Sequence, residues 1–345
     1  MHAAGQRAHA ALAKARRRIA EALQTESSGV IFTSGGTESI NQAIRSAAQI
    51  GEDRGNMHIV STAFEHHAVL HALDALRERG FEITLVAPQR DGIVSVADIE
   101  RAIRSNTCLV SVMAANNEIG TIQPVAEIGA LCRERRILFH CDAVQAVGHI
   151  PVCMDSMHID YLSMSAHKFH GPLGIGALCM KRGAGLVRLL EGGGQERGYR
   201  PGTENVPGAI GMAEALCESI ESMQDNARRI ASLRDRVIAG LSAIPGAHLT
   251  GHSTRRLPGN VHFTFEHVES EPLLVMLDGR GICVSAGSAC TSGALTQSHV
   301  LQALGIPRNR AALRITLDTD NSEDDAEAIV RNVRECVEVL RGGCP

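Results

Sequence analysis

The most informative segment of this chain is Ser163-Met-Ser-Ala-His167-Lys168-Phe-His-Gly171-Pro-Leu-Gly174. It continues an apolar run of strand type and passes into glycine-rich backbone, so Lys168 stands just beyond the end of a predicted strand. An amine in this place, beside hydroxyl and imidazole groups that can bind a phosphate, could hold an aldehyde cofactor covalently. A solvated surface lysine is the alternative, and the rest of the chain has to decide between the two.

Apolar runs of strand type alternate with helical patterns through the first two-thirds of the chain. The predicted strands lie at 30–33, 57–61, 81–86, 108–113, 137–141, 161–164 and 174–180, and helices start near 38, 65, 96 and 125. This alternation predicts an α/β fold with a mostly parallel, seven-stranded sheet that is covered on both faces. Ligands of such sheets bind outside the carboxyl ends of the strands, so the residues that follow the strands are the candidates for function.

The pattern changes after a helical connector at 207–244. Short strands are predicted at 260–265, 282–285 and 313–317, and helices at 271–277, 299–304 and 323–340. We therefore expect a large domain at 20–225 and a smaller α+β domain at 226–345, which residues 1–19 join.

Length and composition exclude several classes of protein. The chain has 345 residues, 44% of them hydrophobic, and a net charge of −4. Its one basic run, Lys14-Ala-Arg16-Arg17-Arg18, lies in an alanine-rich helical segment and is more typical of a solvated face than of a nucleic-acid surface. No apolar run reaches membrane-spanning length, and no secretory signal is visible, so a cytoplasmic protein is predicted. The ten cysteines form no Cys-x-x-Cys pair, which favours reduced thiols and no metal site.

A glycine-rich turn follows the first predicted strand, Thr33-Ser-Gly35-Gly36-Thr37-Glu38-Ser39. Small residues there let backbone N–H groups approach a phosphate, and the helix dipole favours the anion. The segment matches neither the dinucleotide-binding pattern nor the P-loop. An ordinary glycine turn with a helix cap remains the alternative.

Asp142 follows the buried-looking run Ile137-Leu-Phe-His-Cys. A carboxylate at the end of a buried strand needs a positive or hydrogen-bonding partner. The protonated ring nitrogen of pyridoxal phosphate would be one, and holding that proton makes the cofactor a strong electron sink. An Asp that caps the next helix or pairs with an arginine is the alternative. Gln145, three residues on, could reach the same ligand.

Two further segments follow strands. In Glu65-His66-His67 one imidazole could stack on an aromatic ligand or move protons, although adjacent histidines are more often a partly exposed helix start. Asn116-Asn117-Glu118-Ile-Gly120 offers amides for a ligand hydroxyl, or forms a simple turn.

The smaller domain contributes a cysteine and an arginine. Cys290 lies among small residues in Val284-Ser-Ala-Gly287-Ser-Ala-Cys290-Thr-Ser-Gly293, a context typical of an exposed nucleophile rather than a buried thiol. Arg314 lies within an apolar strand, where a guanidinium needs a partner. A substrate carboxylate suits it, and an internal Asp or Glu is the alternative.

Taken in order, these segments resemble the cysteine desulfurases of the NifS/IscS type, in the class V aminotransferase branch of the fold-type-I pyridoxal-phosphate (PLP) enzymes. The similarity runs from about Gly5 to about Leu340. Its markers are Thr33-Ser-Gly-Gly-Thr-Glu-Ser, Glu65-His-His-Ala-Val-Leu, Asn116-Asn-Glu-Ile-Gly-Thr, His140-Cys-Asp-Ala-Val-Gln, Ser165-Ala-His-Lys, Arg200-Pro-Gly-Thr-Glu-Asn and Gly287-Ser-Ala-Cys-Thr-Ser-Gly.

The resemblance implies roles at the cofactor ring. Lys168 holds pyridoxal 5′-phosphate covalently and later moves protons. Asp142 pairs with the ring nitrogen, and His66 stacks on the ring and belongs to the catalytic set with Lys168. Asn117 and Gln145 lie at the phenolic side of the ring, where Asn117 also meets the substrate.

It also implies roles at the phosphate and the substrate. The residues implied in phosphate binding are Gly36, Thr37, Ser165 and His167. Thr203 reaches the phosphate of the neighbouring subunit, which implies a homodimer. Arg314 binds the substrate carboxylate, and Cys290 takes the sulfur.

The implied function is desulfuration of L-cysteine, which gives L-alanine and a persulfide on Cys290 for transfer to an acceptor, for example an iron–sulfur scaffold protein. A PLP-dependent transaminase or lyase is the alternative, although neither needs a nucleophilic thiol. Family members begin with a segment that resembles Leu-Asp-Asn-Ala-Ala-Thr-Thr-Pro, whereas Met1 joins the pattern partway through. A catalytically impaired, shortened homologue is therefore a further alternative.

Overall fold

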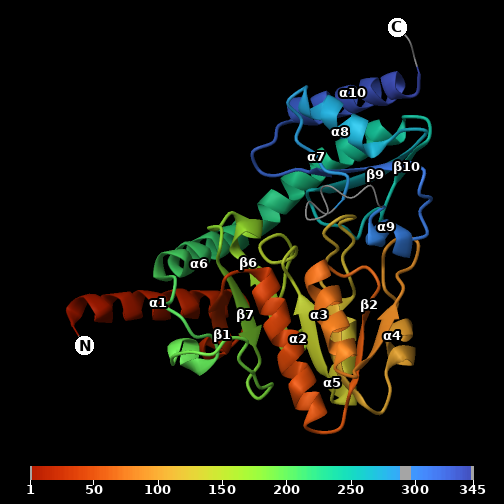
Figure 1. The fold of residues 1–345 in the computed structure, drawn as a ribbon. Helices are drawn as coiled ribbons and strands as arrows, with labels where there is room; N and C mark the ends of the chain where they lie inside the picture. Colours follow the sequence, from red (N-terminus) through yellow and green to blue (C-terminus); the bar gives the residue numbers. More distant parts are fainter. Residues whose placement is uncertain (1, 288–296, 343–345) are drawn as a thin grey trace. The chain divides into compact units, whose positions relative to one another are not determined.

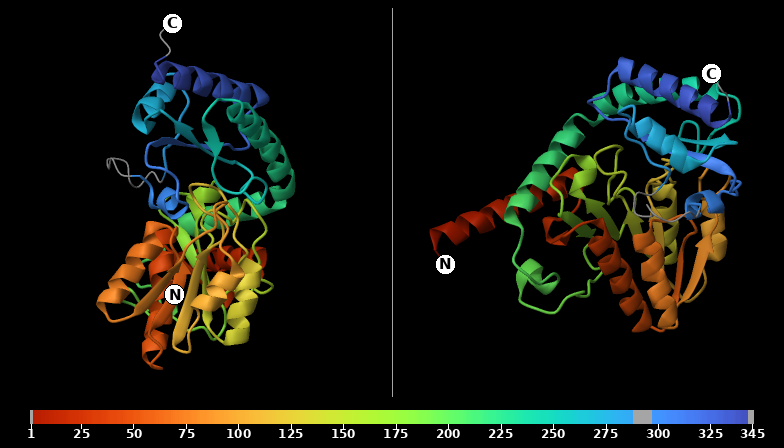
Figure 2. Two further views of the ribbon diagram at one scale, coloured as in Figure 1. Left: turned by 90° about the vertical axis from the view of Figure 1, so that its right-hand side faces the viewer. Right: turned by 45° about the horizontal axis from the view of Figure 1, so that its top comes forward.

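The computed structural model describes residues 2–287 and 297–342, and the chain divides into two compact units. Unit 1 comprises Met1–Val86, Val94–Ala114 and Gln123–Met223, and unit 2 comprises Ala87–Ile93, Ala115–Ile122 and Gln224–Pro345. Two short loops of the first half of the chain thus belong to the second unit. Figures 1 and 2 show the chain coloured along its sequence.

Unit 1 is built on a seven-stranded sheet of order β1-β7-β6-β5-β4-β2-β3. Its strands are β1 Val30–Thr33, β2 His58–Thr62, β3 Glu82–Val86, β4 Thr107–Met113, β5 Leu138–Asp142, β6 Tyr161–Ser165 and β7 Gly176–Met180. Only β7 runs antiparallel to its neighbours; the other pairs are parallel. The predicted mostly parallel, seven-stranded sheet is therefore confirmed.

Amphipathic helices cover this sheet. They are α1 Ala3–Ala22, α2 Gly36–Glu52, α3 His67–Glu78, α4 Val96–Ala102, α5 Val125–Arg135 and α6 Val206–Glu221, with 3₁₀ turns η1 Ser27–Gly29, η2 Ala166–Phe169 and η3 Gln195–Gly198. In α2 the buried residues Ile40, Ala43, Ile44 and Ala47 recur at helical spacing and form one apolar stripe. That stripe joins a core shared by α3 and the strands, so the start of α2 is held firmly at the end of β1.

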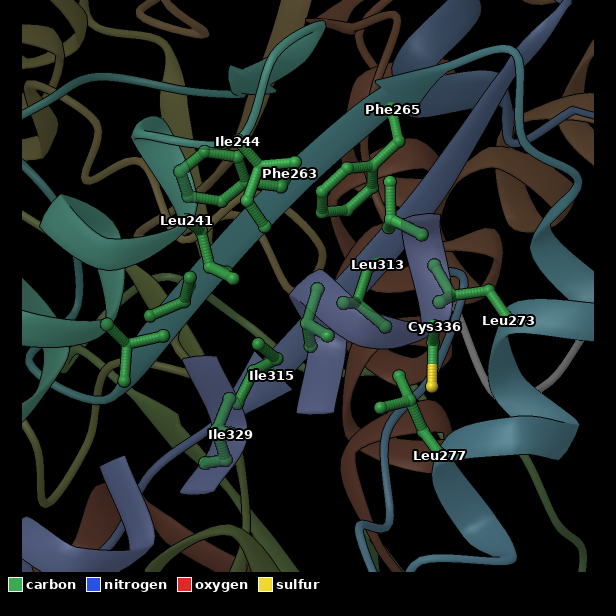
Figure 3. Close-up of a cluster of buried hydrophobic side chains, with 14 of the residues drawn as sticks. Leu241, Ile244, Phe263, Phe265, Leu273, Leu277, Leu313, Ile315, Ile329 and Cys336 are labelled. Atoms are coloured by element: carbon green, nitrogen blue, oxygen red, sulfur yellow. The ribbon is translucent and has the colours of Figure 1, made fainter. Parts of the chain in front are cut away.

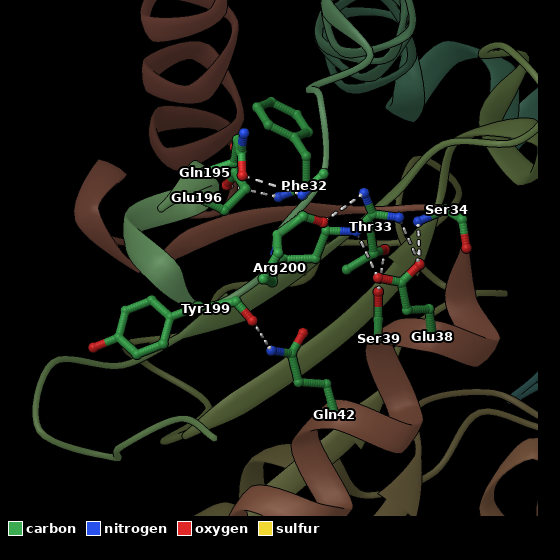
Figure 4. Close-up of polar contacts among 12 residues, drawn as sticks. Phe32, Thr33, Ser34, Glu38, Ser39, Gln42, Gln195, Glu196, Tyr199 and Arg200 are labelled. Carbon is green, nitrogen blue, oxygen red and sulfur yellow. Dashed lines mark hydrogen bonds and ion pairs between the residues drawn. The ribbon is translucent and has the colours of Figure 1, made fainter. Parts of the chain in front are cut away.

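The N-terminal helix α1 corrects one expectation. Residues 1–19 were predicted to join the smaller domain, but α1 belongs to unit 1 and packs along α6. Arg16 donates from both terminal nitrogens, at 2.7 Å each, to the carboxylate of Glu196. Its guanidinium also lies 4.9 Å from the ring centroid of Phe32, and Glu196 accepts from the Phe32 N–H (Figure 4). This contact fixes α1 to the sheet and to the segment that leads to Thr203.

Unit 2 has a three-stranded antiparallel sheet of order β10-β9-β8. Its strands are β8 Ala247–Leu249, β9 Asn260–Glu266 and β10 Arg310–Thr316, and its helices are α7 Met223–Ser242, α8 Ser270–Asp278, α9 His299–Ala303 and α10 Glu323–Leu340. Phe263 and Phe265 alternate along β9 and pack with Leu313, Leu273 and Cys336 in the core (Figure 3). The predicted smaller α+β unit is present.

One predicted strand in unit 2 is wrong. Residues 282–285 form no regular strand, and only Ser285 makes a single bridge, to Arg314. The third strand is instead the short β8, whose pattern of three residues is too brief to stand out from the sequence. None of the helices within residues 2–287 and 297–342 combines the length and apolar character that crossing a bilayer requires.

We predict that Glu196→Ala destabilises the protein. The Glu196 side chain is 2% exposed, and its loss leaves the Arg16 guanidinium buried without its carboxylate, at a cost of about 3–5 kcal/mol. Urea unfolding of the cofactor-free protein measures it. Glu100→Ala, which removes an exposed partner of Arg135, is the control and should leave the midpoint nearly unchanged. Equal shifts for both variants would contradict the prediction.

Candidate active site

Sheet register brings the carboxyl ends of four strands of unit 1 to one edge. Gly176, the first residue of β7, pairs with Thr33 at the end of β1 and with Ser165 at the end of β6. Asp142, at the end of β5, pairs with Met113 of β4 on one side and with Ser163 of β6 on the other. The segments predicted from the sequence to carry function in unit 1 therefore start from one edge.

The turn between β1 and α2 has the shape of an anion cradle. Gly36 begins α2, and a Cβ atom built on it would lie 2.7 Å from Cγ2 of Val144, so only glycine fits against the loop that follows β5. The N-cap residue Gly35 gives no side-chain cap to the helix. Backbone N–H groups at this helix start are the donors that a phosphate would use. Thr37 lies in the same first turn.

Lys168 lies in the 3₁₀ turn η2, directly after β6, and its side chain is exposed. His149 donates from Nε2 to the Lys168 carbonyl oxygen at 2.6 Å, which fixes the backbone there. Three residues before the lysine, the Ser165 hydroxyl lies 2.9 Å from Nδ1 of His167. Burial and the neighbouring Lys168 charge lower the pKa of His167, so the imidazole is neutral and keeps one N–H to donate.

Asp142 is the buried carboxyl group of the site. It is 6% exposed, and its Oδ1 accepts from the Val144 N–H at 3.0 Å. Burial raises its pKa to about 6, against a smaller lowering by that hydrogen bond. A positive group beside it would restore the ionised form.

Glu65 is a further buried acid at this edge, and its sequence motif alone assigned it no role. It is fully buried, and its Oε1 accepts from the Thr62 hydroxyl at 2.6 Å and from the Met113 N–H at 3.0 Å. Burial raises its pKa to about 8, and the charge of Asp142 adds to the rise. It therefore ties the end of β2 to the end of β4. The pattern that singled out Asp142, a carboxylate just after a buried strand, would also have identified Glu65.

His66 directly follows Glu65 in the sequence, and Gln145 lies three residues after Asp142. His66 is the N-cap of α3, and its Nδ1 accepts from the Ala68 N–H at 3.0 Å. This bond sets the orientation of the ring and leaves Nε2 as the nitrogen that carries the proton. Gln145 follows Asp142 in the partly exposed loop after β5.

Asn117 and Arg314 come together within unit 2. Arg314, on β10, donates from Nη1 to the Asn117 carbonyl oxygen at 2.8 Å. The adjacent Glu118 accepts from the Ser298 hydroxyl at 2.6 Å, and its carbonyl oxygen accepts from the Asn260 side chain at 2.9 Å. The loop Ala115–Ile122 is thus held by side chains of the smaller unit.

The remaining predicted site residues are Thr203 and Cys290. Thr203 is exposed, in the segment between η3 and α6. Cys290 lies outside the described residues. Among the residues that the structure describes, no cluster of three or more His, Cys, Asp or Glu side chains could hold a metal ion. The set in unit 1 combines an amine, a buried carboxyl group and a helix start that opens with two glycines, which suits an aldehyde cofactor with a ring nitrogen and a phosphate.

Comparisons with known proteins agree with this chemistry. The family model described as aminotransferase class V matches residues 1–329. A cysteine desulfurase IscS of Methanosarcina thermophila is 46% identical over 333 residues, which cover 96% of this chain and 82% of that relative. One of Clostridium botulinum is 46% identical over 336 residues, covering 96% and 84%. A solved NifS-like protein matches with a TM-score of 0.91 at 36% identity, over 98% of this chain and 90% of that chain.

We predict that Glu65→Gln changes the pH dependence of stability. The pKa of Glu65 rises from 4.5 to about 8 on folding, so wild-type protein loses stability as pH climbs between those values, by about 1.4 kcal/mol per pH unit at most. Glutamine keeps the acceptor oxygen and does not ionise. The free energy of unfolding of the variant, relative to that of wild type, should therefore rise from about pH 5 to pH 8. Urea unfolding of cofactor-free protein at several pH values measures it. A difference that stays constant with pH, as expected for the exposed control Glu100→Gln, would refute it.

Proposed function

This chain belongs to the class V aminotransferase family, and we propose that its reaction is that of a cysteine desulfurase, the removal of sulfur from L-cysteine to give L-alanine. Relatives that carry this name support the proposal over nearly the whole chain. The single observation that carries it chemically is the buried Asp142 carboxyl group, which ends the strand next to the one that leads to Lys168.

The residues at this edge fit pyridoxal 5′-phosphate. Gly36 starts α2 packed closely against Val144, and the backbone N–H groups of this helix start are donors for a phosphate. Asp142 is a carboxyl group that gains its charge when a protonated ring nitrogen lies beside it. When bound, the cofactor supplies an electron sink that stabilises a carbanion at the substrate Cα.

The chain's own groups then have distinct tasks. Asp142 holds the proton on the ring nitrogen. The Lys168 amine would form the covalent attachment and would move the proton at Cα. His66, oriented by its bond to Ala68 N–H, stacks on the ring. Asn117 and Gln145 bind at the phenolic side.

Phosphate and substrate are bound by separate groups. The proposed phosphate ligands are Gly36, Thr37, Ser165 and His167. Arg314, oriented by its bond to the Asn117 carbonyl oxygen, binds the substrate carboxylate bidentately.

Cys290 is the proposed sulfur acceptor. Its thiolate attacks the sulfur of the bound substrate and the carbon–sulfur bond breaks. The electron pair of that bond stays on carbon, where a proton completes the methyl group of alanine, and the sulfur remains on Cys290 as a persulfide.

We further propose a homodimer and a protein acceptor for the sulfur. Thr203 is exposed in the single chain and would reach the phosphate bound by a partner subunit. The persulfide would pass to a sulfur acceptor such as an iron–sulfur scaffold protein. A cytoplasmic location, as inferred from the sequence, belongs to the same proposal.

Incubation of PLP-loaded protein with L-cysteine tests the function directly. Equal amounts of alanine and of sulfur, the latter released from the enzyme by a thiol reductant, are expected. Cofactor-loaded protein that forms no alanine would contradict the proposal, and formation of pyruvate or of an amino-group transfer product would favour a lyase or a transaminase.

For the acceptor cysteine, Cys290→Ala should abolish sulfur release and alanine formation while the cofactor absorbance stays unchanged. The control is Cys283→Ala, which removes an exposed cysteine and should retain turnover. Unchanged turnover in the Cys290 variant would exclude the persulfide route.

For the attachment site, Lys168→Ala should lose the yellow absorbance of covalently bound cofactor after dialysis. Lys181→Ala, which changes another lysine of unit 1, should keep it. A yellow band that survives in the Lys168 variant would assign the attachment to a different amine.

A further inference from the structure

An ion pair stands at the start of α2, beside the proposed phosphate cradle. Glu38 lies in the first turn of the helix and accepts from the Ser34 N–H at 2.8 Å. Arg200 donates to the same carboxylate from Nε at 2.8 Å and from Nη2 at 3.3 Å (Figure 4). The two side chains are 16% and 25% exposed, so the pair is largely shielded from solvent.

Glu38 is charged despite this shielding. Burial would raise its pKa, but hydrogen bonds from Arg200 and Ser34 outweigh burial and hold the pKa below its ordinary value. A carboxylate in the first turn interacts favourably with the helix dipole. It also opposes any second anion bound at the same helix start, because like charges at close range disfavour each other. A phosphate there needs the charge of Glu38 to be cancelled.

Arg200 joins the phosphate loop to the Thr203 segment. It opens the motif Arg200-Pro-Gly-Thr203, and a small cavity of about 70 Å³ has Ser34, Gly174, Arg200 and Thr203 in its walls. The backbone on either side is also fixed: the Tyr199 carbonyl oxygen accepts from Gln42 at 2.9 Å, and the Gly202 N–H donates to Gln195 at 3.2 Å (Figure 4). The Arg200 guanidinium thus contacts the charged Glu38, and the backbone that carries Arg200 is fixed on both sides.

We propose that Arg200 is a positioning residue for the cofactor phosphate: it cancels the charge of Glu38 and holds the Ser34–Glu38 loop so that a phosphate dianion can bind at the start of α2. The inference rests on the proposed function, since it presupposes a phosphate-bearing cofactor. The inference makes a specific prediction. Loss of Arg200 lowers the affinity for the phosphate, and this loss of affinity is smaller when the charge of Glu38 is removed as well.

The test titrates cofactor-free protein with pyridoxal 5′-phosphate and, separately, with pyridoxal, which lacks the phosphate. Arg200→Gln should weaken binding of the phosphorylated aldehyde by about tenfold or more and change pyridoxal binding by less than about threefold. The double variant Glu38→Gln/Arg200→Gln should bind the phosphorylated aldehyde more tightly than Arg200→Gln alone. Arg200→Lys, which keeps the charge, should retain most of the affinity. Arg77→Gln, which removes an arginine paired with Asp74 on the surface, is the control and should match wild type.

The outcomes separate this inference from the proposed function. Equal losses for both aldehydes, or a double variant no better than Arg200→Gln, would show that the ion pair only stabilises the fold and would overturn the inference. Wild-type protein that takes up neither aldehyde would overturn the proposed function, and this inference with it. If Arg200→Gln does not fold, the comparison of Arg200→Lys with Glu38→Gln decides: both should keep their preference for the phosphorylated aldehyde, and loss of that preference in Arg200→Lys would refute the role of its charge.

Discussion

The removal of the Asp142 carboxyl group from water is the constraint on which the rest of the site depends. Desolvation disfavours its ionised form and raises its pKa to about 6. The hydrogen bond from the Val144 N–H offsets only part of this rise in pKa. In the proposed cofactor site, a protonated ring nitrogen would supply the missing positive charge, and the carboxylate would hold that proton in place. Burial that is costly for the carboxylate in the cofactor-free protein would therefore favour a protonated heterocycle.

Unit 1 contains two kinds of shielded acid. Glu196 is paired bidentately with Arg16, and the pKa of Glu38 is lowered by hydrogen bonds from Arg200 and Ser34. Both ion pairs join segments that are far apart in the sequence. The pKa of Asp142 and of Glu65 is raised instead. Raised values at the carboxyl edge of a parallel sheet are typical of groups whose protonation changes when a ligand arrives.

Local patterns in the sequence were sufficient for the sheet and most helices, because strand and helix periodicity are encoded over a few residues. The contacts that complete the site are not local. Arg16 and Glu196 are 180 residues apart, and Glu38 and Arg200 are 162 apart. The spacing of apolar residues along a chain does not reveal pairs of side chains so far apart in the sequence. For this reason α1 was assigned to the wrong unit, and Arg200 received no role. The role of Thr203 came from the resemblance alone, since that residue has no distinctive local pattern.

Asn117, which is proposed to bind the cofactor, is held by Arg314, which is proposed to bind the substrate. Strand β4 ends at Met113 in unit 1, but Ala115–Ile122 belongs to unit 2, where Arg314 donates to the Asn117 carbonyl oxygen and Asn260 and Ser298 contact Glu118. The proposed carboxylate ligand thus also positions the residue proposed for the phenolic side of the ring. Loss of the Arg314 guanidinium would therefore release the Asn117 backbone as well as remove the proposed contact to the substrate carboxylate.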